Sequence, residues 1–175
     1  MNHPDHVRLL RGGVAAGVWA DVGSGSGAFT LALADVLGAG SEIYSIDRDA
    51  GALREQARTM QAQFPTVTLH THLADFTRPL NLPLLDGIVA ANALHFVREK
   101  APVIHLLKSY LKPGGRLVVV EYNVDSGNVW VPHPFSFGAW EKLAQQAGLV
   151  RTQLLATQPS RFLKEIYSAV SFVPA

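Results

Sequence analysis

The chain has 175 residues, with 15 Lys and Arg against 14 Asp and Glu, 48% hydrophobic residues and no cysteine. A chain of this length can bury about 70% of its unfolded surface, so we expect one domain over residues 1–175. The absence of cysteine excludes a disulfide scaffold, thiolate metal sites and a cysteine nucleophile.

A formal charge of +1 without a Lys/Arg cluster does not favour nucleic acid as a partner. No apolar run reaches the roughly 18 residues of a membrane span. We therefore expect a cytoplasmic protein without a membrane partner, and the low charge leaves a homodimer open.

Short β-branched runs alternate with helical patterns along the chain, which is typical of an α/β fold. The first predicted strand is Val18–Val22, and an amphipathic helix follows it and ends at Gly38. A second strand is predicted over Glu42–Ile46. The next helix covers about Ala50–Gln63 and ends before Pro65.

The middle of the chain predicts one edge strand and two central strands. Val67–Leu73 alternates between apolar and polar residues, which indicates an edge strand. Gly87–Ala91 and Leu117–Val120 are continuous apolar runs, as expected of parallel strands covered on both faces. Between them, a helical stripe over Val103–Leu111 ends at Lys112–Gly115.

The last part of the chain predicts a helix and a hairpin. The helix contains Trp140–Ala147 and ends at Gly148. Two extended runs follow, Leu149–Thr157 and Arg161–Phe172, with only Gln158–Ser160 between them. So short a connection cannot hold a crossover, so these two strands are predicted to be antiparallel.

A glycine-rich turn, DVGSGSG, lies between the first strand and the first helix, where open α/β sheets bind ligands. Its spacing is G-x-G-x-G, which differs from the G-x-G-x-x-G of dinucleotide-binding loops. Asp21 stands two positions before Gly23, and its carboxylate suits a positively charged ligand better than a pyrophosphate. S-adenosylmethionine carries a sulfonium and an ammonium group. The alternative is an ordinary tight turn.

Carboxylates also follow the next two strands. Asp47, at the end of the second strand, can accept hydrogen bonds from both hydroxyls of a ribose. Alternatively, Asp47 or Asp49 caps the helix that begins near Ala50. Asp75 and Phe76 end the third strand and offer a carboxylate and an aromatic face to an adenine ring, although Asp75 could also be a plain loop residue.

These stretches together resemble the class I S-adenosylmethionine-dependent methyltransferases, of the small-molecule type similar to the ubiquinone/menaquinone biosynthesis enzymes. The matching stretches are ADVGSGSGAFTLALA, IDRD, ADF, DGIVAANALHFV and LKPGGRLVVVEYN, and they cover nearly the whole chain. The resemblance implies a Rossmann-like three-layer sandwich with a seven-stranded, mostly parallel sheet in the order 3-2-1-4-5-7-6. Its terminal hairpin agrees with the one predicted above.

The resemblance also implies cofactor contacts, residue by residue. It assigns the methionine part to Asp21, Gly23, Gly25 and Gly27, the ribose to Asp47 and adenine to Asp75 and Phe76. Asn92 and its neighbours after the fourth strand would border the methyl group. Arg48 replaces a side chain that is apolar in many relatives. Its planar head could still stack on adenine.

Candidate catalytic residues follow the fourth and fifth strands. His95 could take a proton from an acceptor near neutral pH, or it could be packed under the loop. Glu121 and Tyr122 point in opposite senses, so only one of them is expected to face the site directly. Only Asn92 sits where a metal ligand would be wanted, so no metal is predicted.

Two segments are candidate lids. Residues 123–137 form a long aromatic connection, which we interpret as a substrate lid or a dimer contact. Residues 1–17 form a short N-terminal segment in which Asp5–Leu10 could make a helix over the cofactor. Arg8 or Arg11 would then reach the cofactor carboxylate.

The functional hypothesis is methyl transfer from S-adenosylmethionine to an O, N or C nucleophile of a small, fairly apolar acceptor, whose identity the sequence leaves open. One alternative is an S-adenosylmethionine-binding accessory module without its own turnover. The other is an NAD-dependent oxidoreductase. The short-chain form of that class needs Tyr-x-x-x-Lys, and none of the four tyrosines has a lysine four residues later.

Overall fold

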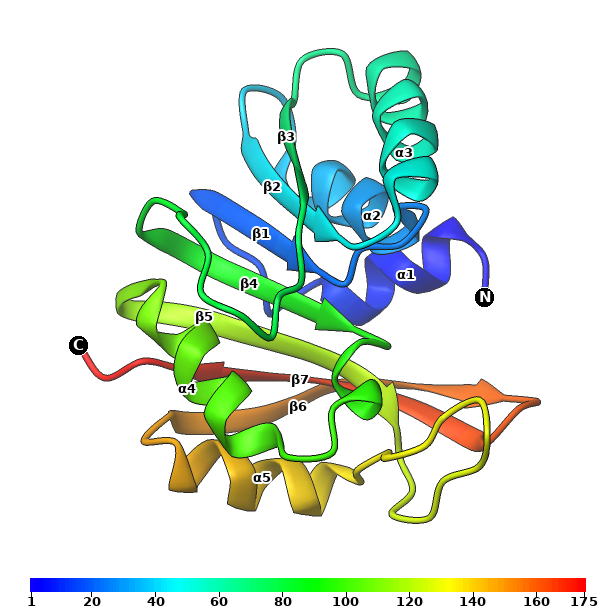
Figure 1. Cartoon of the computed structure of the whole chain (residues 1–175), viewed down its shortest axis with the longest axis vertical. Helices are drawn as coiled ribbons and strands as arrows, with labels where there is room; N and C mark the ends of the chain where they lie inside the picture. The colour runs from blue at the N-terminus through cyan, green and yellow to red at the C-terminus, as the bar shows by residue number, and fades with distance from the viewer.

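The computed structural model describes residues 1–175 and contains one seven-stranded sheet in the order β3-β2-β1-β4-β5-β7-β6 (Figure 1). The strands are β1 (Val18–Val22), β2 (Glu42–Asp47), β3 (Thr68–Leu73), β4 (Leu85–Ala91), β5 (Leu111–Tyr122), β6 (Val150–Ser160) and β7 (Lys164–Phe172). The first five are parallel, and β7 is antiparallel to both β5 and β6. The predicted fold class, strand order and terminal hairpin are confirmed.

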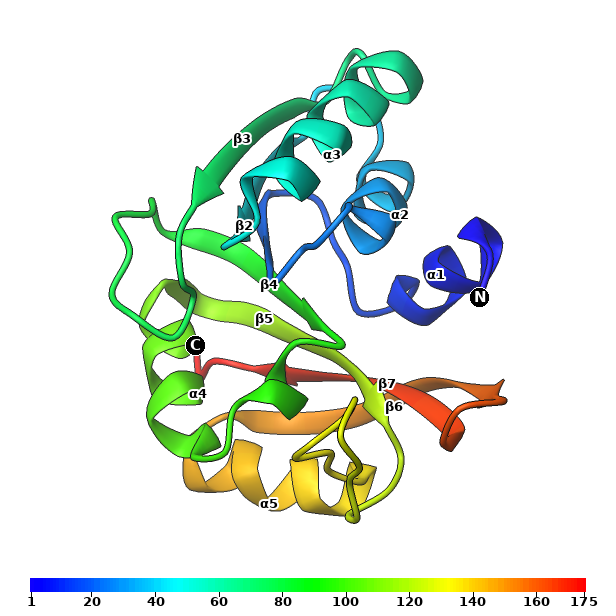
Figure 2. The same cartoon turned by 45° about the vertical axis from the view of Figure 1, so that its right-hand side comes forward.

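Helices cover both faces of the sheet and complete the three layers (Figures 1 and 2). They are α1 (His3–Leu10), α2 (Ala28–Leu37), α3 (Ala50–Gln63), the short 3₁₀ helix η1 (Leu94–Phe96), α4 (Lys100–Ser109) and α5 (Phe137–Gln146). One apolar core lies between the sheet and α1–α3, and a second lies between the sheet and α4–α5. No helix is long and apolar enough to cross a lipid bilayer.

The central strands are buried on both sides, which explains their continuous apolar sequences. In β5, Leu117 and Val119 pack toward α4 and α5, whereas Val118 and Val120 pack toward α1 and α2. The predicted edge strand is β3, which pairs only with β2. The period-2 alternation of side chains therefore distributes each central strand between the two cores.

Two predicted boundaries were wrong. The hairpin turn lies at residues 161–163, because β6 continues through Pro159 to Ser160. Proline is tolerated there because β6 is the edge strand, so one side of its backbone needs no partner. Helix α4 ends at Ser109, and Leu111 already pairs with Leu85 of β4. The segment Lys112–Gly115 thus forms an irregularity within β5 and does not itself end the helix.

The strand order creates a switch point at β1, which pairs with β2 on one side and β4 on the other. The connections that leave these strands run in opposite directions along the sheet. A crevice therefore opens outside the carboxyl ends of the strands at this point. The loops after β1, β2, β3 and β4 all border this crevice.

Gly87 of β4 supports the indole of Trp19, which is fully buried and donates from Nε1 to the Ala15 carbonyl at 2.8 Å. A Cβ on Gly87 would come within 2.3 Å of Trp19 Cη2. We expect Gly87→Ala to lower the free energy of unfolding by about 1–3 kcal/mol, the usual cost of overpacking. Urea denaturation measures this change.

The matched control is Gly138→Ala in α5, where a Cβ meets no atom within 4 Å. An alanine in that helix should leave stability unchanged or raise it by about 0.5–1 kcal/mol. Equal unfolding midpoints for the two variants would contradict the packing role of Gly87.

Candidate active site

The glycine-rich turn is clamped onto the end of β2. The Gly23 and Ser24 amides both donate to the Ile46 carbonyl, at 2.8 and 3.1 Å. The Gly25 amide donates to Asp47 Oδ2 at 2.8 Å. Gly23 and Gly25 have φ values of +69° and +53°, in the left-handed region that glycine adopts without strain.

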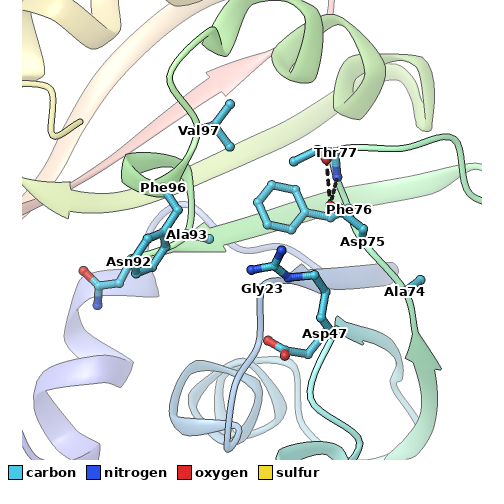
Figure 3. Close-up of a pocket in the computed structure, with 11 residues that line it drawn as sticks. Gly23, Asp47, Ala74, Asp75, Phe76, Thr77, Asn92, Ala93, Phe96 and Val97 are labelled. Atoms are coloured by element: carbon cyan, nitrogen blue, oxygen red, sulfur yellow. Dashed lines mark hydrogen bonds between the residues drawn. The ribbon is translucent and has the colours of Figure 1, made fainter. Parts of the chain in front are cut away.

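The crevice holds a cavity of about 240 Å³ beside this turn (Figure 3). It is lined by Gly23, Asp47, Arg48, Ala74, Asp75, Phe76, Thr77, Asn92, Ala93, Phe96 and Val97. Six of the nine predicted cofactor residues are therefore together in one cavity. Gly25 and Gly27 belong to the turn but do not line the cavity, and Asp21 is buried at the end of β1.

Asp47 and Asp49 take different roles. Asp49 caps α3, because its Oδ1 accepts from the Gly51 and Ala52 amides at 2.7 and 3.0 Å. These hydrogen bonds hold the pKa of Asp49 below its usual value. Asp47 Oδ1 accepts from the Asp49 amide at 2.8 Å, and its carboxylate lines the cavity. The cap predicted for one of the two aspartates is thus Asp49, which leaves Asp47 oriented toward the cavity.

Asp75 is fixed by Thr77, two residues further along the chain. Its Oδ1 accepts from the Thr77 amide at 2.9 Å and from the Thr77 hydroxyl at 2.7 Å (Figure 3). The hydroxyl hydrogen bond and then the amide hydrogen bond hold the pKa of Asp75 below its usual value. The side chain is therefore an oriented carboxylate at the cavity wall, next to Phe76.

Asn92 has a strained backbone at the opposite end of the cavity from Asp75 (Figure 3). Its φ is +50°, a conformation that asparagine adopts more readily than most residues. Its amide donates to the Val120 carbonyl at 2.8 Å, which fixes this conformation. The side-chain Oδ1 is buried and has no hydrogen-bond partner within the chain. An orphaned acceptor beside a cavity is suited to a ligand that donates hydrogen bonds.

His95 and Glu121 form a buried pair beside the cavity. His95 Nδ1 lies 2.7 Å from Glu121 Oε2, and the two side chains are 4% and 0% exposed. The His95 amide also donates to Glu121 Oε1, at 3.2 Å. When Glu121 is ionised and the imidazole is neutral, this pairing puts the imidazole proton on Nδ1 and the lone pair on Nε2. His95 is thus packed under the loop, as one interpretation expected, with Nδ1 turned toward Glu121.

Phe96, the residue after His95, lines the cavity, although His95 itself does not. The ring of Phe96 lies 4.3 Å from the His95 ring, centroid to centroid, and the ring of Tyr122 lies 6.0 Å away. Of the two candidates at the end of β5, Glu121 is the one that contacts His95 directly. Tyr122 lies on the other side of β5 and is half-buried, and burial and then the Glu121 charge raise its pKa.

The loop 123–137 is anchored to η1. The His133 amide donates to the His95 carbonyl at 2.9 Å, and Lys100 Nζ donates to the Val97 and His133 carbonyls, both at 2.8 Å. Phe135 is buried in the core, whereas Trp130 is 74% exposed at the tip. The loop is thus packed at its base and exposes one large aromatic side chain.

The helix predicted at Asp5–Leu10 is present as α1, and it packs against α2 and β6. Arg8 donates to the Thr157 carbonyl at 3.0 Å and also contacts Gln158 Oε1. No residue of α1 lines the cavity beside the glycine-rich turn. The Arg8 guanidinium is thus engaged at the sheet edge, away from this cavity.

Five residues that line the cavity were not named as site residues from the sequence: Ala74, Thr77, Ala93, Phe96 and Val97. Thr77 had a local signal, because an Asp-x-Thr sequence after a strand is able to form an Asx turn. Ala93 and Val97 had none, because small apolar side chains acquire a role here only through the path of the chain after β4.

Asp21 lies beneath the glycine-rich turn, 1% exposed, and its Oδ2 accepts from the Thr30 hydroxyl at 2.6 Å. Burial raises its pKa from 3.8 to about 7, against the lowering effect of the Thr30 hydrogen bond and with a smaller contribution from the Asp47 charge. The native state therefore binds a proton that the unfolded state releases between these two pH values. The contribution of Asp21 to the free energy of unfolding therefore falls as pH rises from about 4 to about 7.

We expect Asp21→Asn, which has no charge at any pH, to remove this fall. The free energy of unfolding of the variant, relative to that of the wild type, should therefore increase by on the order of 4 kcal/mol between low and high pH. Urea denaturation of both proteins over about pH 4 to 8 measures the difference, in which contributions from other groups cancel. Parallel stability curves would show that Asp21 ionises normally.

Comparison with known proteins identifies the family. The model of the methyltransferase domain family matches residues 16–164. A reducing polyketide synthase of Penicillium, grgA, is 26% identical over 163 residues. That match includes 79% of this chain but only 6% of the synthase. The chain therefore matches a small part of a much longer relative.

Two solved structures share the fold. An S-adenosylmethionine-dependent methyltransferase from Aquifex aeolicus has a TM-score of 0.74 and 17% identity, over 97% of this chain and 89% of that one. The CurJ carbon methyltransferase has a TM-score of 0.75 and 18% identity, over 91% of this chain and 49% of that one.

The family match extends over most of the chain, and the accessory-module and oxidoreductase alternatives are not favoured. The specific similarity to the ubiquinone/menaquinone type stays a prediction. The chain belongs to the methyltransferase domain family, and its fold is that of the class I methyltransferases.

Proposed function

We propose that this chain methylates an acidic carbon of an acyl acceptor, with His95 as the general base and Glu121 as the residue that orients it. The buried His95–Glu121 pair is the observation that carries the proposal, because Nδ1 is only 2.7 Å from the carboxylate. His95 Nε2 makes no hydrogen bond within the chain and is not among the fully buried polar atoms that lack a partner. It is therefore the ring nitrogen that can meet an acceptor.

The cavity residues fit S-adenosylmethionine, which supplies a methyl group on a positively charged sulfur. Asp47 would accept from the ribose hydroxyls, and Asp75 with Phe76 would hold adenine, with Arg48 at the rim. Asn92 Oδ1, which is buried without a donor, suits the methionine end of the cofactor. A Cβ on Gly23 would come within 2.8 Å of Ala93 Cβ, so the glycine keeps this end of the cavity open.

A buried base is needed most by a carbon acceptor. An amine already carries a lone pair when neutral, whereas a C–H carbon becomes a nucleophile only after a proton is removed. In the proposed step, His95 Nε2 takes the proton from carbon, and the electron pair of that C–H bond forms the new carbon–methyl bond. The methyl–sulfur bond breaks, its electron pair stays on sulfur, and S-adenosylhomocysteine leaves. General-base catalysis of this kind contributes about 10²- to 10⁴-fold in rate.

The relatives support an acyl acceptor. One is a polyketide synthase and another is a carbon methyltransferase. A carbon between a ketone and a thioester, as in a 3-oxoacyl thioester, is acidic because both carbonyls stabilise the carbanion. We propose this class as the acceptor.

Aromatic side chains continue from the cavity past the base. Phe96 is 62% exposed, and Phe162 is 49% exposed with its ring 5.9 Å from Tyr122. These rings would cover the apolar part of an acyl chain. We propose that the 123–137 loop, with Trp130 at its tip, closes over the same chain.

His95→Asn tests the base. Asparagine can keep a donor near Glu121 but lacks Nε2, so we expect turnover to fall about 10²- to 10⁴-fold. The dissociation constant for S-adenosylmethionine should stay within about twofold, because the side chain does not line the cofactor cavity. The assay uses a 3-oxoacyl thioester of N-acetylcysteamine, with C2-methyl product detected by mass spectrometry and NMR.

His105→Asn in α4 is the matched control, since this exposed histidine only contacts the Ala101 carbonyl. It should leave turnover unchanged. Methylation of amines or alcohols by the wild type, with no C2-methyl product, would refute the carbon acceptor. Unchanged turnover in His95→Asn would remove His95 from the mechanism.

Asp47→Ala tests the ribose contact. Losing two hydrogen bonds to a charged group costs about 3 kcal/mol, so affinity for S-adenosylmethionine should fall about 100-fold in calorimetric titration. Asp49→Ala is the control, because loss of a helix cap lowers stability by about 1 kcal/mol without removing a cavity side chain. Equal losses of affinity in the two variants, or tight binding of NADH by the wild type, would disprove the cofactor assignment.

A further inference from the structure

A buried chain of hydrogen bonds runs beneath the glycine-rich turn and joins five elements of the fold. It begins at Asp21 of β1, which accepts from Thr30 of α2 at 2.6 Å. Thr30 accepts from Gln56 Nε2 of α3 at 2.9 Å, and Gln56 Oε1 accepts from Ser45 of β2 at 2.5 Å. Ser45 Oγ lies 2.7 Å from Ser24 Oγ in the turn itself.

The hydrogen bonds of this chain have a consistent direction. The Thr30 hydroxyl donates to Asp21 Oδ2 and accepts from the Gln56 amide group. Ser45 donates its proton to Gln56 Oε1, so in the contact between the two serines Ser24 must be the donor. Each link thus depends on the next. Gln56 is the only member that takes part through two different side-chain atoms, with Nε2 as a donor and Oε1 as an acceptor.

Gln56 is fully buried, which is unusual for a helical glutamine. A Cβ on Gly27 would lie only 2.4 Å from Gln56 Cγ. The glycine at this position therefore lets the carboxamide pass directly beneath the turn. Helix α3 contributes no residue to the cofactor cavity, so Gln56 reaches the cofactor only through the turn.

We infer that Gln56 is a positioning residue for the amino-acid half of S-adenosylmethionine. It connects Asp21 and Ser24, which flank Gly23 where the turn borders the cavity. The nucleoside half is assigned to Asp47, Asp75 and Phe76, whose orientation depends on other contacts, such as the Thr77 hydrogen bonds to Asp75. Loss of the Gln56 side chain should therefore weaken the binding of the amino-acid half and leave the binding of the nucleoside half nearly unchanged.

Gln56→Met removes both polar atoms while nearly keeping the volume, and leaves Ser45 and Thr30 each without one partner. The test compares the dissociation constants of two ligands that differ only in the amino-acid half. For S-adenosylhomocysteine, the dissociation constant should rise about tenfold, whereas for 5′-methylthioadenosine it should stay within about twofold. Without ligand, the Gly23 and Ser24 amides should exchange with deuterium faster than in the wild type.

Gln61→Met, at an exposed position of the same helix, is the matched control and should change neither constant. Ser45→Ala breaks the chain at its neighbouring link with a smaller change in volume, and serves as the second variant if Gln56→Met does not fold. It should show the same selective loss.

Equal weakening of both ligands, or unchanged binding in a folded variant, overturns the inference, because Gln56 would then only stabilise α3. Binding of neither ligand by the wild type overturns the cofactor assignment itself. No acceptor is present in these titrations, so they are independent of whether carbon is the atom methylated.

Discussion

The geometry of the site depends on the attachment of the glycine-rich turn to the end of β2. Three consecutive amides, from Gly23 to Gly25, donate to the Ile46 carbonyl and to Asp47. These hydrogen bonds join the loop after β1 to the strand beside it, so the turn and the Asp47 carboxylate form one rigid unit. Left-handed backbone angles at the glycines allow the amides to point at β2, which a side chain at these positions would oppose.

The sheet topology separates the residues proposed to bind the cofactor from the proposed base. Asp47 ends β2 and Asp75 follows β3, on one side of β1, whereas His95 follows β4 and Glu121 lies near the end of β5, on the other. Asn92 lies where the two groups meet, at the switch point of the sheet. A methyl group held near Asn92 would thus lie between the cofactor residues and the base.

Charge at the site is controlled by burial. Asp75 meets solvent and is held ionised by Thr77, whereas Asp21 is buried and holds its proton up to about pH 7. Binding of a ligand with an ammonium group near Asp21 would favour the ionised form of this carboxyl. The buried Lys100 donates two hydrogen bonds, to the carbonyl of Val97 just after η1 and to that of His133 in the 123–137 loop, which keeps the backbone around His95 in place.

The sequence by itself determined the fold class and most strand positions, and the strand order came from the resemblance to the class I methyltransferases. It could do so because period-2 and period-3.6 patterns and glycine-rich turns are local properties of the chain. It also indicated Asp47, Asp75, Phe76 and Asn92, since the ends of parallel strands meet at one edge of a sheet. The sequence did not give the correct position of the last turn, because Pro159 is compatible with a strand only at a sheet edge.

Only the tertiary structure decided which polar side chains are partners. His95 and Glu121 are 26 positions apart, and their contact requires β4 and β5 to be neighbours in register. Gln56 has the sequence environment of an ordinary helical glutamine, and it becomes part of the site only because α3 packs beneath the turn. Hydrogen bonds act over about 3 Å, so which residues form them depends on the packing of distant segments and not on their spacing in the chain.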